Sequence, residues 1–573
     1  MTAREFSLAI TGAGGAGVIS VGELLLQAWA RAGGRGLLRK AFGPQIRGGE
    51  SAALLTLTES ERYTAAERCD LLLALDWNNF TRFGDEIRLH PGSVVLCENG
   101  DALPEGLRAL SLIVLETPFT DIAARAHGEG RGNMLALGVL AAALELRADD
   151  VAALADDRLS GKPAAYREAA AACVAAGHAL APLPALELPR RSAGSRWYLS
   201  GNQAAAYGAL RAGVRFVAAY PITPASDALE YLASPLERLG GTLVQAEDEL
   251  AAINMALGAA YGGVAAFTAT SGPGLALMTE SLGLAVASET PVTVLNVMRG
   301  GPSTGIPTKS EQADLAIALH GLHGDAPHLV LAPLSVGDCA MTTATAVRFA
   351  EALQTPAIVL SDQFLGHSTA IVTPPDLEPG ASLAPPVPPE HRADDSYRRY
   401  QLTDSGVSPR AVPGMEEMRF TADGLEHNER GTPSAGAADH AAQLDKRRRK
   451  LDALRDSSCW GAVQGDGAVA LLCFGSASAA VFAAQETLTA RGLATRAIAL
   501  RLLSPLPVAA IEAALADCDS LFVIEQNHGA QLFTYLRGEL GLQNTVHSIA
   551  RPGPVPLGKT VIVQAVEEAL GHD

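Results

Sequence analysis

The sequence predicts an α/β protein built from three α/β domains. Hydrophobic residues make up 48% of the chain but aromatic residues only 5%, and there are 57 glycines. This composition is typical of Ala/Val/Leu-packed layers joined by glycine-rich turns between strands and helices. Short apolar runs alternate with helical patterns along most of the chain. A length of 573 residues corresponds to roughly three to four domains, so several separate cores are expected.

Residues 1–190 are predicted to form the first domain. An apolar strand, Phe6–Ile10, is followed by a turn in which Gly12, Gly14 and Gly17 match the GxGxxG pattern, and then by a helical pattern. Further strand-like runs alternate with helices at Leu71–Leu75, Val94–Cys97 and Leu112–Leu115. The segment PLPALELPRRSAGSR breaks this alternation with prolines, which places a boundary near residue 190.

Residues 191–373 and 458–573 are predicted to form the second and third domains. The predicted strands of the second domain are Phe216–Ala219, Val264–Thr268, Val292–Val297 and Ala357–Leu360. Those of the third domain are Ala468–Phe474 and Ser520–Ile524. Residues 374–457 lie between the two domains and are rich in proline, glycine and charge. We therefore expect this segment to be a long extended connector.

The net charge of −18 argues against partners that carry many phosphates. With 44 Lys and Arg against 62 Asp and Glu, the chain offers no basic field for nucleic acid or an anionic membrane, so small molecules or proteins are expected. The uncharged stretch 250–279 contains Asn254, Pro273 and many small residues, and is expected to be buried rather than to span a membrane. The start of the chain does not resemble a signal peptide.

The cysteines are too widely spaced for a local zinc or iron–sulfur motif. The two nearest of the seven, Cys459 and Cys473, are 473 − 459 = 14 positions apart. We therefore expect no metal site in this chain, and a reducing, cytoplasmic environment.

The strongest local signal is the segment YPITPASD at 220–227. Its two prolines fix a loop at the carboxyl end of a predicted parallel strand, where α/β folds place ligands. The alternative interpretation is an ordinary strand-to-helix turn in which Thr223 or Ser226 caps the next helix.

A second signal is the acidic cluster in QAEDELAA at 245–252. It precedes a helix with small residues at Ala252, Ala256 and Gly258, which permit close approach of another group. A carboxylate here either serves a ligand or is a surface charge stabilised by the helix dipole.

Together these segments resemble the aminopyrimidine-binding domain of thiamine diphosphate enzymes. YPITPASD, TATSGPG (268–274) and NVMRGGPSTGIPTKSEQADL (296–315) are similar to the alpha region of 2-oxoacid:ferredoxin oxidoreductases. The resemblance extends to RGGES (47–51) in a γ-type amino-terminal domain and to a transketolase-like carboxyl-terminal domain. It covers nearly the whole chain, which therefore resembles a fused γα subunit.

The resemblance implies roles for individual residues. Glu249 would hydrogen-bond the aminopyrimidine ring of thiamine diphosphate, with Glu247 as the alternative. Arg299 and Thr308 would bind the 2-oxoacid, and Thr223 would hydrogen-bond the substrate. The other residues expected at the cofactor or the substrate are Ile222, Thr270, Ser271, Gly272 and Lys309, the last for a second carboxylate.

The resemblance also implies partners. In the family, a separate β subunit supplies a [4Fe-4S] cluster, the Mg²⁺ and diphosphate site and the rest of the cavity, so an (αβ)2 assembly is expected. Coenzyme A would be the co-substrate and ferredoxin the electron acceptor. The favoured substrate is 2-oxoglutarate, with pyruvate or a branched-chain 2-oxoacid as alternatives. The direction, oxidative decarboxylation or carbon-fixing carboxylation, stays open.

The amino-terminal glycine turn has two interpretations. A nicotinamide site normally has an acidic residue about 20 positions later, but the chain reads LLRK at 37–40. We instead expect Gly14, Gly15, Arg47 and Gly48 to contact coenzyme A phosphates. An NAD-dependent dehydrogenase and a noncatalytic assembly subunit remain the alternative functions.

Three weaker motifs complete the sequence analysis. The basic run KRRRK at 446–450 is expected to form a solvated helix face. His427, which lies among acidic residues, is expected to be exposed or hydrogen-bonded rather than a metal ligand. The segment EQNH at 525–528 follows a predicted strand, where sites and subunit interfaces occur, and its role stays open.

Overall fold

The computed structural model describes residues 4–43, 49–77, 80–100, 102–180, 183–184, 186–375, 377, 397–542 and 545–571. The chain divides into two compact units. The first consists of residues 1–200 and 367–374, and the second of residues 201–366 and 375–573.

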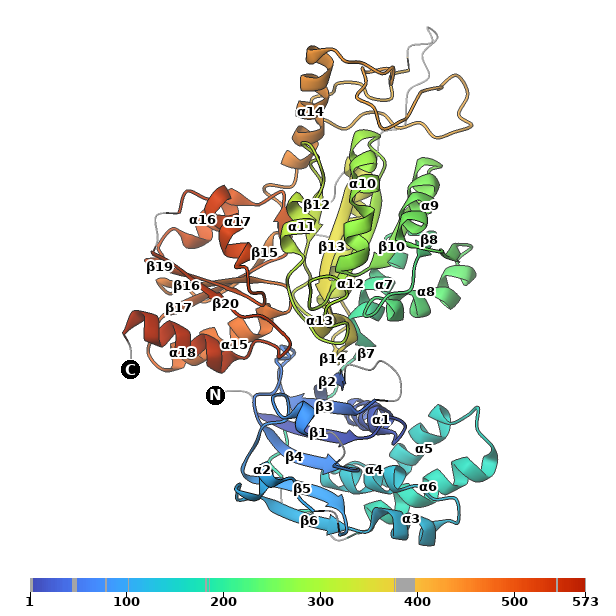
Figure 1. Ribbon diagram of the computed structural model, residues 1–573, viewed down its shortest axis with the longest axis vertical. Helices are drawn as coiled ribbons and strands as arrows, with labels where there is room; N and C mark the ends of the chain where they lie inside the picture. The colour runs from blue at the N-terminus through green and yellow to red at the C-terminus, as the bar shows by residue number, and fades with distance from the viewer. Residues whose placement is uncertain are drawn as a thin grey trace. The chain divides into compact units, whose positions relative to one another are not determined.

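The first unit contains an eight-stranded mixed sheet with the order β6-β5-β4-β1-β3-β2-β14-β7 (Figure 1). Its strands are β1 (Glu5–Gly12), β2 (Arg35–Phe42), β3 (Ser51–Thr58), β4 (Cys69–Ala74), β5 (Leu89–Glu98), β6 (Ile113–Thr117), β7 (Trp197–Ser200) and β14 (Thr369–Val372). Its helices are α1 (Val18–Arg31), α2 (Glu105–Arg108), α3 (Phe119–Ala126), α4 (Gly132–Ala143), α5 (Ala148–Arg158) and α6 (Ala164–His178). Strands β1, β4, β5 and β6 pair in parallel, and the remaining neighbours pair antiparallel.

The second unit contains a seven-stranded sheet with the order β18-β12-β13-β11-β10-β8-β9 (Figure 1). Its strands are β8 (Phe216–Ala219), β9 (Thr242–Gln245), β10 (Ala266–Thr270), β11 (Val292–Met298), β12 (Leu329–Leu331), β13 (Pro356–Asp362) and β18 (Leu502–Ser504). The helices nearest to these strands in sequence are α7 (Gly201–Arg211), α8 (Ser226–Arg238), α9 (Glu249–Tyr261), α10 (Gly272–Ala287), α11 (Leu315–His320), α12 (Asp338–Leu353) and α13 (Gln363–His367). All neighbours pair in parallel except β18, which pairs antiparallel with β12.

A five-stranded sheet with the order β15-β17-β16-β19-β20 completes the second unit. Its strands are β15 (Gly461–Gln464), β16 (Val469–Phe474), β17 (Thr495–Leu500), β19 (Ser520–Glu525) and β20 (Thr545–Ala550). The helices of this part are α14 (Ala437–Asp452), α15 (Ala477–Ala490), α16 (Val508–Leu515), α17 (Gln531–Glu539) and α18 (Lys559–Leu570). Because β18 comes from the last part of the chain and pairs with β12, backbone hydrogen bonds tie this part to the seven-stranded sheet.

The predicted fold class is confirmed, since all three sheets carry helices in an α/β arrangement. The predicted strands correspond to observed ones, with ends that differ by at most two residues except at β5, which begins at Leu89 instead of Val94; Val264–Thr268, for example, corresponds to β10. Half of the strands that the structure describes were not predicted: β2, β3, β7, β9, β12, β14, β15, β17, β18 and β20. Strands β7 and β14 lie inside the predicted range 191–373 but belong to the sheet of the first unit. The predicted boundaries near 190, 373 and 457 stay predictions.

The described part of the connector contains no helix or strand from 397 to 436, and α14 follows. His427 is buried and hydrogen-bonded: its Nε2 lies 3.1 Å from the backbone oxygen of Ala287, and its ring stacks on Tyr400. This agrees with the hydrogen-bonded alternative of the sequence analysis.

The basic run on α14 is not a solvated face. Lys446 Nζ lies 2.6 Å from Oε1 of Glu289, Lys450 Nζ lies 3.2 Å from Oε2 of the same carboxylate, and all three side chains are at most 1% exposed. Burial alone would raise the pKa of Glu289, but Lys450, Lys446 and Arg399 together hold it well below its usual range. The prediction failed because the acidic partner comes from the turn after α10, far away in the sequence.

Replacing Glu289 by Gln is expected to lower the free energy of unfolding by about 3–5 kcal/mol, because it leaves two buried ammonium groups without their counter-charge. The thermal midpoint measures this loss. Glu429→Gln is the control, since Glu429 forms a half-exposed pair with Arg398 and should cost little.

Acidification provides a second measurement. A carboxyl whose pKa is depressed on folding contributes stability that is present above its usual value of 4.5 and lost as the pH falls through the folded-state pKa. The wild-type midpoint should therefore fall more steeply below about pH 4.5 than that of Glu289→Gln. Parallel pH profiles would contradict this role of the carboxylate.

Candidate active site

Four neighbouring parallel strands bring the predicted site residues to one edge of the seven-stranded sheet. Strands β11, β10, β8 and β9 are adjacent in that order. Arg299 follows β11, Ser271 follows β10, Thr223 lies in the loop after β8, and Glu249 lies shortly after β9. Because parallel strands end at the same edge of a sheet, residues up to 76 positions apart converge there.

Glu249 is the buried acid of its cluster. It is the first residue of α9 and is 7% exposed, whereas Glu247 and Asp248 are exposed. Asp248 caps the helix, because its Oδ1 accepts a hydrogen bond from the backbone N–H of Ala251 at 2.7 Å. With the capping role filled by Asp248, burial supports Glu249 over Glu247 as the residue that meets a ligand.

The start of α10 packs directly against Glu249. A Cβ atom added to Gly274 would lie 2.1 Å from Oγ1 of Thr270 and 2.7 Å from Cγ and Oε1 of Glu249. No real Cβ atom tolerates such distances. The glycine in TSGPG therefore permits the close approach of the helix to the carboxyl group.

Arg299 lies between the loop after β8 and two carboxylates. It is buried, and its Nη1 donates to the backbone oxygen of Thr223 at 2.5 Å. Burial lowers the pKa of Arg299, and the negative charges of Asp314 and Glu249 oppose that shift. The guanidinium is thus a buried cation whose position is tied to two of the other candidate segments.

Asp314 is a further acidic residue at this edge that no sequence motif marks as a site residue. Its Oδ2 accepts a hydrogen bond from Nδ2 of Asn296 at 2.9 Å, and a Cβ atom on Gly272 would lie 2.6 Å from its Oδ1. Burial raises the pKa of Asp314, while Asn296 and Arg299 act in the opposite direction. The only sequence signal was an acidic residue near the end of the quoted motif. Nothing in the motif indicated that its side chain contacts Asn296 on β11.

The residues after Arg299 form a short hairpin. The N–H of Gly300 donates to the oxygen of Lys309 at 3.1 Å, and the N–H of Ile306 donates to the oxygen of Gly300 at 2.8 Å. Gly305 has a φ of +53°, and a Cβ atom there would lie 1.8 Å from the oxygen of Gly300, so the tip requires glycine. The hairpin brings the buried Thr308 and the half-buried Lys309 back to the end of β11.

The loop after β8 is not a simple side-chain cap. The backbone oxygen of Ile222 accepts from the N–H groups of Ala225 and Ser226 at 2.8 and 3.1 Å, and no side chain caps α8. A residue that the sequence analysis missed, Asn202, donates through Nδ2 to the oxygen of Pro224 at 2.7 Å. The interpretation that Thr223 or Ser226 caps the helix is therefore wrong.

Several buried polar atoms at this edge have no hydrogen-bond partner within the described residues. They are Oγ1 of Thr268, Oγ of Ser271, Oδ1 of Asn296 and Nε of Arg299. Native proteins rarely leave buried polar groups unsatisfied, and a ligand or ordered water normally completes them. All four lie on β10, on β11 or directly after these strands, which fits a polar ligand at this edge.

The other predicted contacts lie elsewhere. Gly14 and Gly15 are exposed at the turn after β1, where Oδ2 of Asp76 accepts from the N–H of Ala13 at 2.7 Å. Arg47 and Gly48 lie outside the described residues.

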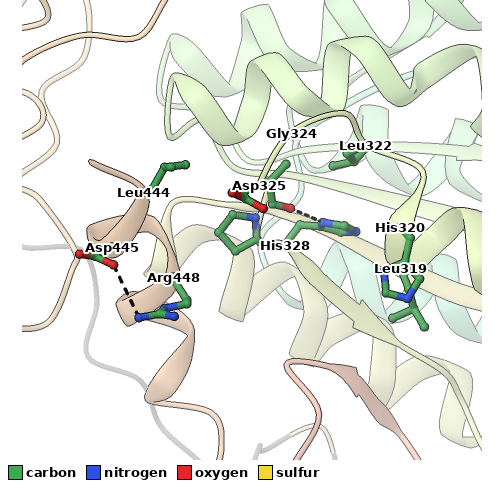
Figure 2. A pocket seen from close by; sticks show the side chains of 11 residues that line it. Leu319, His320, Leu322, Gly324, Asp325, His328, Leu444, Asp445 and Arg448 are labelled. Carbon is green, nitrogen blue, oxygen red and sulfur yellow. Dashed lines mark hydrogen bonds and ion pairs between the residues drawn. The ribbon is translucent and has the colours of Figure 1, made fainter. Parts of the chain in front are cut away.

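A cavity of about 590 Å³ in the second unit contains none of the predicted site residues (Figure 2). It is lined by Leu319, His320, Leu322, Gly324, Asp325, Ala326, Pro327 and His328, and by Leu444, Asp445 and Arg448 of α14. Arg448 pairs with Asp445 at 3.6 Å, and the ring nitrogens of His328 lie 2.7 and 2.8 Å from backbone oxygens. Several of its polar groups thus already have partners, so we keep the candidate site at the strand ends.

Within the described ranges, no group of three His, Cys, Asp or Glu side chains is arranged to hold a metal ion. All seven cysteines are buried free thiols, and burial raises the pKa of Cys69 and Cys473 to about 12. No helix in the part of the chain that the structure describes is long and apolar enough to cross a membrane.

Residues 207–446, which include every candidate residue from Ile222 to Lys309, match the family "Pyruvate flavodoxin/ferredoxin oxidoreductase, thiamine diP-bdg". Residues 7–180 match the family "Pyruvate ferredoxin/flavodoxin oxidoreductase". The 2-oxoglutarate synthase subunit KorA of Methanothermobacter thermautotrophicus is 34% identical over 352 residues, which cover 60% of this chain and 92% of the relative. The chain belongs to the 2-oxoacid:ferredoxin oxidoreductase family.

Other members of this family agree with the assignment. Subunit alpha of the 2-oxoacid:ferredoxin oxidoreductase 2 of Aeropyrum pernix is 36% identical over 393 residues; the match covers 65% of this chain but only 60% of that protein. The solved 2-oxoglutarate:ferredoxin oxidoreductase of Magnetococcus marinus has a TM-score of 0.89 and 34% identity, with 99% of both chains covered. Membership in this family decides against the NAD-dependent dehydrogenase as the alternative function.

The close approach at Gly274 provides a test of the site. Gly274→Ala is expected to displace Glu249 and, on the role that the resemblance implies for this carboxyl group, to reduce turnover by at least about tenfold, because small displacements in an active site are costly. Gly258→Ala on α9 is the matched control, since its Cβ atom would meet nothing within 4 Å. Equal turnover in the two variants would remove Gly274 from the site.

Proposed function

We propose that this chain is the alpha subunit of a thiamine-diphosphate-dependent 2-oxoacid:ferredoxin oxidoreductase whose preferred substrate is 2-oxoglutarate. The observation that carries the proposal is the convergence of the buried Glu249 and Arg299, together with Thr223, at the carboxyl edge of one parallel sheet. The matched thiamine diphosphate domain spans all three residues.

The residues at this edge fit thiamine diphosphate. Among the described residues, buried polar atoms on and after β10 and β11 have no hydrogen-bond partner and could bind the cofactor. The absence of a side chain at Gly274 lets the carboxyl group of Glu249 lie beside the start of α10. The residues that would hold the cofactor are Ile222, Glu249, Thr270, Ser271 and Gly272. When bound, thiamine diphosphate supplies the carbon nucleophile and the electron sink that decarboxylation of a 2-oxoacid needs.

The protein side chains then have distinct tasks. The carboxyl group of Glu249 would form a hydrogen bond with the aminopyrimidine ring and would exchange a proton with that ring. The guanidinium of Arg299 would bind the carboxylate of the substrate, with hydroxyl groups from Thr308 and Thr223 beside it. Because Arg299 is buried, its attraction for an anion is screened less than it would be at the surface.

The choice of 2-oxoglutarate rests on the relatives and on one further cation. The Methanothermobacter relative is named a 2-oxoglutarate synthase subunit, and the Magnetococcus structure contains 2-oxoglutarate, coenzyme A and succinyl-CoA. A substrate with a second carboxylate needs another cation, and Lys309 lies at the base of the same hairpin. Pyruvate and branched-chain 2-oxoacids have no such second charge.

Exposed apolar side chains on the elements that carry the site support a partner subunit. Large apolar side chains are exposed on the elements that carry the site: Tyr220, Leu250, Met255, Leu277 and Ile306 are 40–50% exposed. Exposed apolar groups gathered near a site are typical of an interface. We infer that a β subunit bearing the [4Fe-4S] cluster and the Mg²⁺ site covers this edge in an (αβ)2 assembly in the cytoplasm.

The remaining reactants follow from the same reaction. Ferredoxin would accept the electrons, and coenzyme A would accept the acyl group, with Gly14, Gly15, Arg47 and Gly48 as its proposed contacts. The carboxylate of Asp76 already accepts the N–H of Ala13 at this turn, so a phosphate there would need the cation of Arg47.

In the complex with its β subunit, Glu249→Gln is expected to reduce kcat by about 100-fold or more, as loss of an acid–base group does. Glu247→Gln is the control with an exposed neighbouring acid, and should leave kcat unchanged. Full turnover by both variants would favour the noncatalytic assembly subunit.

Competition between 2-oxoglutarate and pyruvate tests the substrate. The complex should prefer 2-oxoglutarate in kcat/KM, and Lys309→Met should reduce this preference by about tenfold, because it removes a cation from the second carboxylate. A preference of the wild-type complex for pyruvate would reject 2-oxoglutarate while leaving the family reaction intact.

A further inference from the structure

The carboxyl-terminal part of the chain holds the segment 310–316, which directly follows the proposed substrate hairpin, through amide side chains. Nε2 of Gln526 donates to the oxygen of Ser310 at 3.2 Å, and Nδ2 of Asn527 donates to the oxygen of Gln312 at 3.2 Å. Both ends of the Gln531 amide bind this segment. Its Nε2 donates to the backbone oxygen of Ala313 at 2.8 Å, and its Oε1 accepts from the N–H of Ala316 at 2.8 Å. Backbone groups of this segment ahead of α11, and the N–H of Ala316 in its first turn, are thus satisfied largely by side chains from the last part of the chain.

Gln312 makes the reciprocal contact. Its Nε2 donates to the oxygen of Phe474 at 2.9 Å, and its Oε1 accepts from the N–H of Gln526 at 2.9 Å. Phe474 ends β16 and Gln526 directly follows β19, and the ladder between these strands ends at the pair Leu472 and Val523. The amide of Gln312 therefore bridges the two strands just beyond the point where their own pairing stops.

The amide cluster is built on a rigid base. Glu525 is fully buried, and its carboxylate accepts from the N–H groups of Leu532 and Phe533 at the start of α17 and from Nδ2 of Asn527. These contacts satisfy the charge and orient the amide next to it. Gln312, Gln526 and Asn527 are each at most 2% exposed. The EQN segment, whose role the sequence left open, is therefore an internal contact within this chain.

The segment 310–316 contains Asp314, whose charge acts on Arg299, the proposed substrate-binding residue. Asp314 lies between Ala313 and Ala316, whose backbone groups Gln531 binds, and its carboxylate accepts from Asn296 on β11. It is also one of the two negative charges that face Arg299. A shift of the segment would therefore move a carboxylate whose negative charge acts on the guanidinium of Arg299.

We propose that Gln312 is a positioning residue for 2-oxoacid binding: by joining the ends of β16 and β19 to the segment after the hairpin, it sets Asp314 and, through it, Arg299. This inference rests on the proposed role of Arg299. Gln312 and Gln526 do not touch the substrate. They transmit the position of the carboxyl-terminal sheet to the substrate site.

The test measures KM for 2-oxoglutarate, kcat and the thermal midpoint in the complete complex. Gln312→Leu is expected to raise KM by about tenfold with a smaller change in kcat, because it misplaces a substrate-binding group. Gln526→Leu keeps the two contacts that the backbone of residue 526 makes with Gln312, so it should raise KM less. It is the milder variant to use if Gln312→Leu folds poorly. The matched control is Gln485→Leu, which removes another buried amide of the same domain that binds Thr495 and Thr489; it should lower the midpoint without changing KM.

Combining variants separates a positioning role from a structural one. Because Gln312 acts through Arg299, Gln312→Leu should add nothing to the raised KM of Arg299→Ala. Additive effects, or an equal rise in KM in Gln485→Leu, would overturn the positioning role. An unchanged KM in Gln312→Leu beside a raised KM in Arg299→Ala would overturn this inference alone, whereas an unchanged KM in Arg299→Ala would overturn the proposed role of that arginine as well.

Discussion

The common ending of strands β11, β10, β8 and β9 at one sheet edge is the constraint on which the rest of the site depends. A parallel ladder forces each strand to end on the same side, and the chain must leave that edge by a loop or a helix. This common edge is what first brings Thr223, Glu249, Ser271 and Arg299 together. The chemistry that each offers comes from its side chain, but its place comes from the ladder.

The second feature of this sheet edge is that it buries charged side chains. Removing Glu249 and Arg299 from water is costly unless opposite charges and hydrogen bonds compensate. Here the opposing charges of Asp314 and Glu249 face Arg299, while its Nε and other nearby polar atoms have no partner among the described residues. The site thus combines satisfied charges, which hold it in place, with unsatisfied atoms that suit a polar ligand.

The same principle anchors two other parts of the second unit. The carboxylate of Glu289 forms ion pairs with Lys446 and Lys450, which fix α14 to the turn after α10. The amides of Gln312 and Gln526 join the carboxyl-terminal sheet to the segment after the hairpin. Both contacts are buried and polar, so they allow few alternative arrangements. Apolar packing would bind these parts as well, but it would specify their relative positions less closely.

The sequence by itself determined the α/β class, about half of the strand positions and the candidate residues from Ile222 to Lys309, because these depend on local apolar runs and on short motifs. The resemblance already favoured Glu249 over Glu247, but only the tertiary structure showed that Glu249 is the buried one, since exposure depends on what packs against a helix start. The partner of the basic run, the contacts of Asp314 and the role of Gln526 were likewise not predictable. Each depends on a pair of residues far apart in the chain, and hydrophobic periodicity carries no information about which distant polar groups meet.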